Sequence, residues 1–328
     1  MEADRPPNRK EKLSIAGQIE DLRRRGVRFD AGEVELARDC LAHRRSLLHL
    51  SAYRTLFPKH LEGPHKGKYI DLSFGDLVML DELDSQLRDT FLYLALQAEM
   101  SAKMRLLFAV SECSEEDGYE IVQNFMSSLS PSRRNALIAE LARRGGKGAP
   151  KNPYTGELIR AYEQAMPIWV FVEVVTFGTL LSLYRFCSIR WNSRKMNHEY
   201  YLLKQVKDVR NACGHQNCIV NGFSKVQTNK YRVVPEIKSA LAKHNLSRSD
   251  GSRDKLCNPC IQGLVSVLYS ARYFSPSTEF TIKRLSELDT KLVDTINAFG
   301  PPVRISFVSY LLYLHKVIQA WFLLTRDP

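Results

Sequence analysis

A regular spacing of apolar residues through positions 74–110 limits the fold more than any other feature of this chain. The apolar side chains recur every three or four positions, which places them on one face of an α-helix with the charged side chains opposite. Ser73 precedes the run and is a typical N-cap residue. The sequence therefore predicts one long helix that packs along an apolar face formed by Leu77, Leu80, Leu83, Leu87, Phe91, Leu94 and Ala98.

Helical spacing continues through most of the remaining chain. A first helix is expected from a cap at Ser14 to a stop at Gly26, and a second helical stretch after Asp30, ended by Pro58. Further helices are expected through the last seventy residues and over 131–144, 157–186 and 195–213.

These patterns predict an all-α fold. The β-prone residues 230–234 leave room for one small β-hairpin at most. We expect an N-terminal helical region over 1–72, a helical core over 73–225 and a C-terminal helical extension over 226–328.

One segment, residues 165–184, is apolar enough to resemble a membrane span. It carries a single charge, Glu173, near its middle, where an acidic side chain is costly in lipid. We therefore expect a buried core helix and no membrane partner. Because a carboxylate in such a helix needs a partner, Glu173 is expected to pair with an arginine or with the motif described below, and Arg210 is one candidate.

The charge and cysteine content indicate the compartment and the kind of partner. Lys and Arg number 47 against 36 Asp and Glu, a net charge of +11, which favours a polyanionic partner such as nucleic acid. The seven cysteines are an odd number, and no apolar leader precedes the first charges, which argues against a disulfide-based secreted fold. We expect a cytoplasmic protein.

The stretch KDVRNACGHQNC, residues 207–218, carries the strongest candidates for chemistry. Arg210 offers a planar cation suited to phosphate oxygens, and His215 can transfer protons at neutral pH. RNA carries its own nucleophile, the 2′-OH, so cutting it needs a proton-transfer group and a cation but no metal. These residue types in one short stretch therefore suit RNA cleavage without a cofactor.

Helix geometry limits how these residues act together. Asn211 and His215, four apart, share a helix face, so Asn211 is placed to hold the imidazole or to contact substrate. Arg210 and His215, five apart, diverge by about 140° around the helix. Either the helix distorts at Gly214, or two copies of the motif form one shared site.

Four alternative roles for residues 207–218 remain open. Gly214 can simply end a helix, with Arg210 and His215 as surface polar groups. A second role is a structural zinc site, and a third is a cysteine–histidine dyad between His215 and a neighbouring thiol. A fourth is a non-catalytic RNA-binding module. The candidate zinc ligands besides His215 are Cys213, Cys218, Cys257 and Cys260.

The segment RNACGHQNCIVN, residues 210–221, resembles the R-N-x-x-x-H motif of HEPN ribonuclease domains, in the form carried by Abi-like (abortive infection) bacterial proteins. MPIWVFVEVVTFGTLLSLY, LDELDSQLRDTFLYLALQAEMSAKMR and KLSIAGQIEDLRRRGVRF are also similar to that family's segments, so the resemblance covers roughly residues 12–225. The chain departs from the family pattern at Gln216 and Cys218, and Lys103 stands where arginine is usual.

The resemblance implies a HEPN-like helical bundle that forms a homodimer and cuts RNA without a metal or other cofactor. Arg210, Asn211 and His215 are the implied catalytic residues, with Glu99, Lys103, Glu173 and Asn221 in support. The implied partner is RNA, as substrate or as a regulatory or guide strand. The implied role is antiphage defence through growth arrest or cell death.

Overall fold

The structure, a computed structural model, describes residues 12–145, 152–224, 233–246, 255–275, 278–299 and 307–324. These residues are almost entirely helical, as predicted. Their one sheet has two parallel two-residue strands, β1 (Val27–Arg28) and β2 (Leu72–Ser73), paired through Val27 with Leu72 and Arg28 with Ser73. Of the β-hairpin expected at 230–234, residues 230–232 lie outside the described residues.

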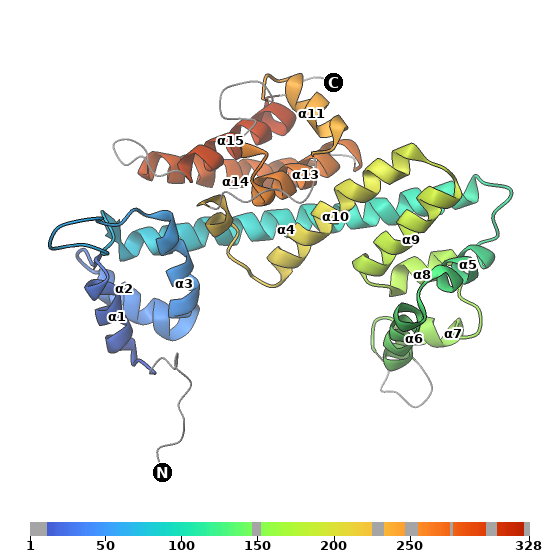
Figure 1. Ribbon diagram of the computed structural model, residues 1–328, viewed down its shortest axis with the longest axis horizontal. Coiled ribbons are helices and arrows are strands. Elements are labelled where there is room, and N and C mark those ends of the chain that lie inside the picture. Colours follow the sequence, from blue (N-terminus) through green and yellow to red (C-terminus); the bar gives the residue numbers. More distant parts are fainter. Residues whose placement is uncertain are drawn as a thin grey trace, which may run out of the picture.

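The predicted long helix is confirmed as α4 (Phe74–Ser111), which runs the length of the molecule (Figure 1). Ser73 and Asp76 form a capping box, in which each side chain accepts a backbone N–H of the other residue. All seven apolar positions predicted for its packing face are buried. The other elements are arranged along α4.

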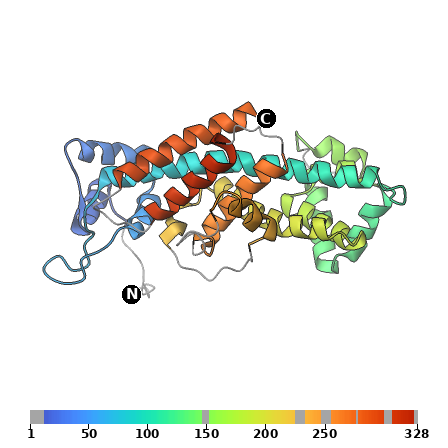
Figure 2. The same ribbon diagram turned by 90° about the horizontal axis from the view of Figure 1, so that it is seen from above.

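The N-terminal helices lie together at one end of α4 (Figures 1 and 2). Helix α1 begins after the Ser14 cap, as predicted, and the chain turns at Gly26 with φ +91°. A Cβ at Gly26 would lie 2.9 Å from the backbone N of Tyr69, so this approach needs glycine. The elements here are α1 (Ile15–Arg24), α2 (Glu33–Asp39), the π-helix η1 (Cys40–Arg44), α3 (Leu47–Tyr53) and the 3-10 turn η2 (Arg54–Leu56).

The opposite end of α4 carries α5 (Glu120–Ser128), α6 (Pro131–Gly145), α7 (Gly156–Ala161), α8 (Ile168–Val174) and α9 (Phe177–Arg190) (Figure 1). The helical pattern expected over 157–186 is divided among three helices, because the chain leaves the helical conformation at Tyr162 and again at Val175. Thr176 then caps α9 by accepting the Thr179 N–H. Within the described residues, no helix is long and apolar enough to cross a membrane.

Helix α10 (Arg194–Gly214) runs back along α4 and packs against α4, α9 and α13. The C-terminal elements are η3 (Val220–Ser224), α11 (Pro235–Ala242), α13 (Pro259–Tyr273), α14 (Glu279–Ala298), α15 (Val308–Ile318) and the π-helix η4 (Gln319–Leu323). Both α13 and α14 contact α4.

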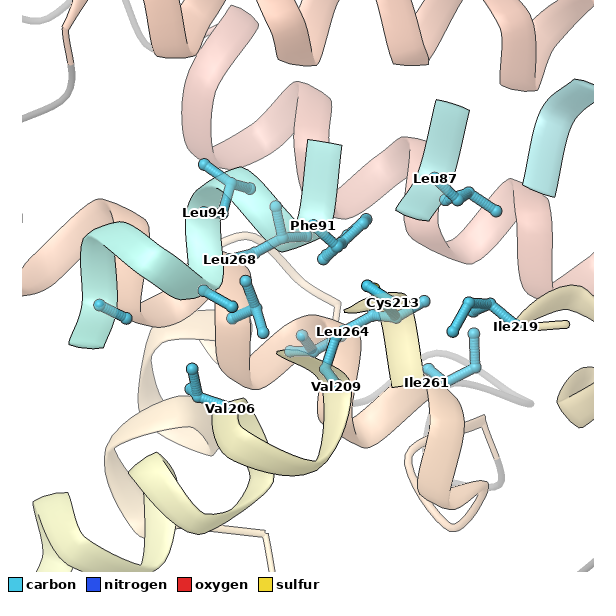
Figure 3. Packing of buried hydrophobic residues seen from close by; sticks show 14 of the residues in the cluster. Leu87, Phe91, Leu94, Val206, Val209, Cys213, Ile219, Ile261, Leu264 and Leu268 are labelled. Atoms are coloured by element: carbon cyan, nitrogen blue, oxygen red, sulfur yellow. The ribbon is translucent and has the colours of Figure 1, made fainter. Parts of the chain in front are cut away.

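Figure 3 shows where three of these helices meet. Leu87 and Phe91 of α4 face Val209 and Cys213 of α10, with Leu264 of α13 beside them. One continuous cluster of buried apolar residues includes both this junction and the N-terminal and C-terminal helices. The C-terminal helices therefore share a core with the helix that carries the motif.

Candidate functional site

The motif lies at the C-terminal end of α10, where His215 is the exposed C-cap residue. The N–H of His215 donates to Asn211 O (2.9 Å), the regular helical bond, so the helix continues undistorted through Gly214. Gln216 ends it with φ +54°, and Asn217 N–H closes the turn on Ala212 O (2.9 Å). Helix α10 does end at Gly214, as one of the alternatives expected, but Gln216 and not the glycine takes the left-handed position that turns the chain.

A regular helix keeps Arg210 and His215 apart. With no distortion at Gly214, their side chains leave α10 about 140° from one another. The guanidinium Nη1 of Arg210 donates to Asn211 Oδ1 (3.1 Å), so the Asn211 side chain orients the arginine. Of the two arrangements that the sequence allowed, a distortion of the helix at Gly214 is not observed.

Arg210 forms an ion pair with a carboxylate on α4. Its Nε lies 3.8 Å from Glu99 Oε2 on α4, which is an ion pair beyond hydrogen-bond distance. In the described part of the chain both atoms are buried without a hydrogen-bond partner, although the Arg210 side chain as a whole is 40% exposed. Burial raises the pKa of Glu99, and the charges of Arg210 and Lys103 oppose that rise. Arg210 is thus placed by its attraction to Glu99 and by the hydrogen bond from its Nη1 to Asn211.

Glu173 pairs with Lys103, whose Nζ donates to Glu173 Oε2 at 3.0 Å. The expectation that Glu173 needs a cationic partner is confirmed, but the partner is a lysine on α4 and not an arginine. Glu173 is also 42% exposed, because α8 turns this position, like Trp169 one turn earlier, toward solvent. The pair ties α8 to α4 within one helical turn of Glu99.

The segment that follows His215 is anchored by Asp84 on α4, a residue that was not among the candidate site residues. Its carboxylate is fully buried and accepts the backbone N–H groups of Ile219 (3.0 Å) and Val220 (2.9 Å). Tyr53 OH (2.9 Å) and Arg88 Nη1 (2.5 Å) donate to the same group. Burial raises the pKa of Asp84, while these donors oppose that rise.

A sequence signal for Asp84 did exist. Asp84 and Arg88 are spaced i, i+4 and lie on the apolar face of the long helix, between Leu80 and Phe91. Charged residues are rarely buried unless they are paired, so a matched pair at such positions indicates a buried ion pair.

Two further contacts surround the anchored segment. Thr55 Oγ1 donates to Asn221 Oδ1 (2.5 Å), which joins η2 to η3. On α3, the His49 ring bonds Asp81 (3.0 Å), and the Cys218 Sγ lies 3.8 Å from the same ring. The Asn221 side chain thus holds the chain after His215 against η2 and takes no part in the Arg210–Glu99 pair.

The cysteines occupy separate environments. Cys213 lies in the core shown in Figure 3, where burial raises the pKa of its thiol to about 12, whereas His215 is exposed. Cys218 contacts His49, and Cys260 packs so closely on Gly222 that a Cβ there would overlap its sulfur. Among the residues that the structure describes, no three His, Cys, Asp or Glu side chains are grouped to hold a metal. The candidate zinc ligands are therefore not brought together there.

Comparison with known proteins gives one positive result. No curated protein and no solved structure matches this chain. The family model for Abi-like proteins matches residues 41–221, a span that includes α4, Asp84, Glu99, Glu173 and the whole motif from Arg210 to Asn221. Since this match covers more than half of the chain, the protein belongs to the Abi-like protein family.

Proposed function

We propose that this Abi-like protein is a metal-independent endoribonuclease of an abortive-infection or toxin-type system. The observation that carries the proposal is the placement of Arg210, Asn211 and His215 at the open end of α10, with the arginine fixed by Glu99. The family membership and the resemblance of the motif to that of HEPN ribonucleases support it.

In this proposal each residue has a separate role. His215 moves a proton at the 2′-OH or at the leaving 5′-oxygen, and Arg210 stabilises the negative charge that develops on the phosphate. Asn211 holds the guanidinium through its amide oxygen. Glu99 gives Arg210 a fixed direction by ionic attraction, and Lys103 bonded to Glu173 secures the neighbouring turn of α4.

The working unit in this proposal is a homodimer. Arg210 and His215 diverge on an undistorted helix, so one chain presents them to different directions. Two copies related by a two-fold axis can present the arginine of one and the histidine of the other to the same phosphate.

The test is incubation of labelled single-stranded RNA with the wild type and with His215→Ala, in excess EDTA. His244→Ala is the matched control, because His244 is also exposed and also follows the end of a helix. We expect the wild type and His244→Ala to leave 2′,3′-cyclic phosphate or 3′-phosphate ends, and His215→Ala to bind RNA without cutting it. Equal cleavage by both histidine variants would remove His215 from the mechanism.

The net charge of +11 favours a second candidate, a non-catalytic RNA-binding protein. In that case the folded wild type binds RNA, with an affinity that falls steeply with salt, and produces no new RNA ends. The same incubation therefore separates the two candidates.

A further inference from the structure

A cavity of about 710 Å³ opens between α1 and α3 at the N-terminal end of the molecule. Helix α1 lines it with Asp21, Arg24 and Arg25, and α3 with Ser46 and Ser51. Arg54, at the start of η2, completes the polar part of the wall. Neither the motif nor the family resemblance assigns this cavity a role.

The described residues that line this cavity carry a net charge of +2. Asp21 is its one acidic lining residue within the described chain, and both of its oxygens are already used. Oδ1 accepts from Arg24 Nη2 (2.5 Å), and Oδ2 accepts from Arg25 Nε (2.7 Å). The hydrogen bond from Arg25 lowers the pKa of Asp21, so that carboxylate is ionised at neutral pH. Among the residues that the structure describes, Arg54 has no carboxylate of its own.

Arg54 lines the cavity, and its guanidinium is poorly satisfied among the described residues. Its Nη1 is buried and has no hydrogen-bond partner in the part of the chain that the structure describes. Its Nε makes a long bond to Ser51 O (3.4 Å), and the group lies over the Tyr69 ring at 5.8 Å. Burial lowers the pKa of Arg54, because a cation that loses its water is destabilised, and the neighbouring Tyr69 and Asp21 oppose this shift.

We propose that this cavity binds a phosphate monoester, with Arg54 as the residue that recognises the phosphate. A monoester carries a charge of about −1.5 to −2 at neutral pH, which matches the surplus of two, whereas a phosphodiester carries one charge. The planar fork of arginine suits phosphate oxygens.

The remaining wall fits the rest of such a ligand. Ser46 Oγ accepts the His49 N–H as an N-cap, so its own hydrogen stays available to an oxygen of the ligand. Leu41, Leu47 and Leu48 supply an apolar surface beside the charged groups. A nucleoside 5′-monophosphate and the 5′-phosphorylated end of an RNA share this chemistry.

The cavity lies across α3 from the anchored segment. Ser46, Ser51 and Arg54 face it, while His49 and Tyr53 on the other side of α3 contact Asp81, Asp84 and Cys218. The ligand site is therefore separate from Arg210 and His215. Phosphate binding in this cavity does not depend on the proposed ribonuclease activity, and its test reads binding alone.

The experiment measures the melting temperature and the Kd of the full chain with AMP, with adenosine, and with an RNA trinucleotide carrying a 5′-phosphate or a 5′-hydroxyl. The variants are Arg54→Gln and, as the matched control, Arg28→Gln at the same end of the molecule. Arg28 is 58% exposed and lies outside the cavity lining. To keep the RNA intact, both variants and the reference carry His215→Ala.

We expect AMP or the 5′-phosphorylated trinucleotide to raise the melting temperature of the reference and of Arg28→Gln, with no comparable effect of adenosine or the 5′-hydroxyl RNA. Arg54→Gln should weaken phosphate binding about tenfold or more. Without ligand, Arg54→Gln should melt at the same or a higher temperature, because it removes a partly buried cation that forms no ion pair with a described residue. Binding of AMP but not of the RNA identifies a free nucleotide as the ligand, and binding of the phosphorylated RNA identifies an RNA end.

Three results would overturn the inference. One is equal affinity of Arg54→Gln and Arg28→Gln for the phosphorylated probes. Another is equal binding of the phosphorylated and hydroxyl probes, which would show that the phosphate is not recognised. The third is a clear loss of ligand-free stability in Arg54→Gln, which would assign Arg54 a structural role against Tyr69.

Discussion

The carboxylate of Asp84 accepts the backbone N–H of Val220 at 2.9 Å, five residues after His215 in the sequence. This bond joins the first third of α4 to the segment that follows His215, and Arg88 balances the charge of Asp84 from one turn further along α4. The position of the exposed motif is therefore fixed from inside the core, by groups that substrate does not touch.

Replacing Asp84 by Asn should be strongly destabilising. The variant leaves Arg88 buried without a counter-charge, and its amide N–H₂ faces groups that themselves donate hydrogen bonds. We expect the free energy of unfolding to fall by about 3–5 kcal/mol. Urea unfolding measures the loss. Glu82→Gln on the same helix is the control, since its pair with Lys291 is exposed and contributes about 1 kcal/mol or less. Similar losses in the two variants would contradict the anchoring role of Asp84.

The dimeric site predicts complementation between two inactive variants. Arg210→Ala and His215→Ala should each be inactive alone, because each shared site then lacks one group. Their mixed dimer keeps one site with an intact arginine and an intact histidine, so co-expression should restore up to about half of the wild-type rate per dimer. Cleavage by purified mixed dimers, separated by two affinity tags, measures this. A mixed dimer that stays inactive would place both groups in one chain's site.

The raised pKa of Glu99 gives a pH-dependent prediction. Burial makes the folded protein hold this proton more tightly than the unfolded chain does. The ionised form is therefore penalised in the folded state, and stability decreases as the pH rises from the unfolded pKa through the raised one. Glu99→Gln removes this penalty, so it should raise the melting temperature relative to wild type at pH 7. The difference should vanish below about pH 4, where both states are protonated. A melting-temperature difference that does not change with pH would contradict a penalty on the ionised form of Glu99.

The approach of α13 to α10 depends on Gly263. A Cβ at this position would lie 2.8 Å from Val209 Cγ2, one residue before Arg210. Gly263→Ala should force the helices apart and destabilise the protein by about 1–3 kcal/mol. Gly178→Ala is the control, because its nearest neighbour would be Thr176 Oγ1 at 3.9 Å, and it should be neutral or stabilising by up to about 1 kcal/mol. Chemical denaturation of both variants tests the contact.

The end of α10 predicts two stabilising substitutions. Gly214 is helical and a Cβ there would meet no atom within 4 Å, so Gly214→Ala should add about 0.5–1 kcal/mol of stability. Gln216 has φ +54°, and Gln216→Gly should relieve about 1 kcal/mol of strain. Thermal unfolding measures both. If Gly214→Ala is instead destabilising, the helix does not continue through that position.

Local patterns in the sequence were sufficient for the helices and for the motif. Apolar spacing identified α4 and its buried face, and Ser14 and Ser73 marked helix starts, because caps and periodicity depend on near neighbours in the chain. The same local reasoning did not locate the left-handed turn after α10 or the breaks within 157–186. Gln216 takes a φ of +54° that its residue type does not favour, and the extended Val175 interrupts an apolar run whose spacing continues on both sides.

The pairing of charges was decided by the tertiary structure alone. The sequence showed that Glu173 needs a partner, but the choice of Lys103, and of Glu99 for Arg210, depends on how α8 and α10 cross α4. The bond between Asp84 and Val220 spans 136 positions of the chain. Such contacts depend on the packing of whole helices, which spacing along one helix does not determine. The sequence by itself thus determined the all-α fold and the candidate motif, and the packing around α4 decided which groups hold that motif in place.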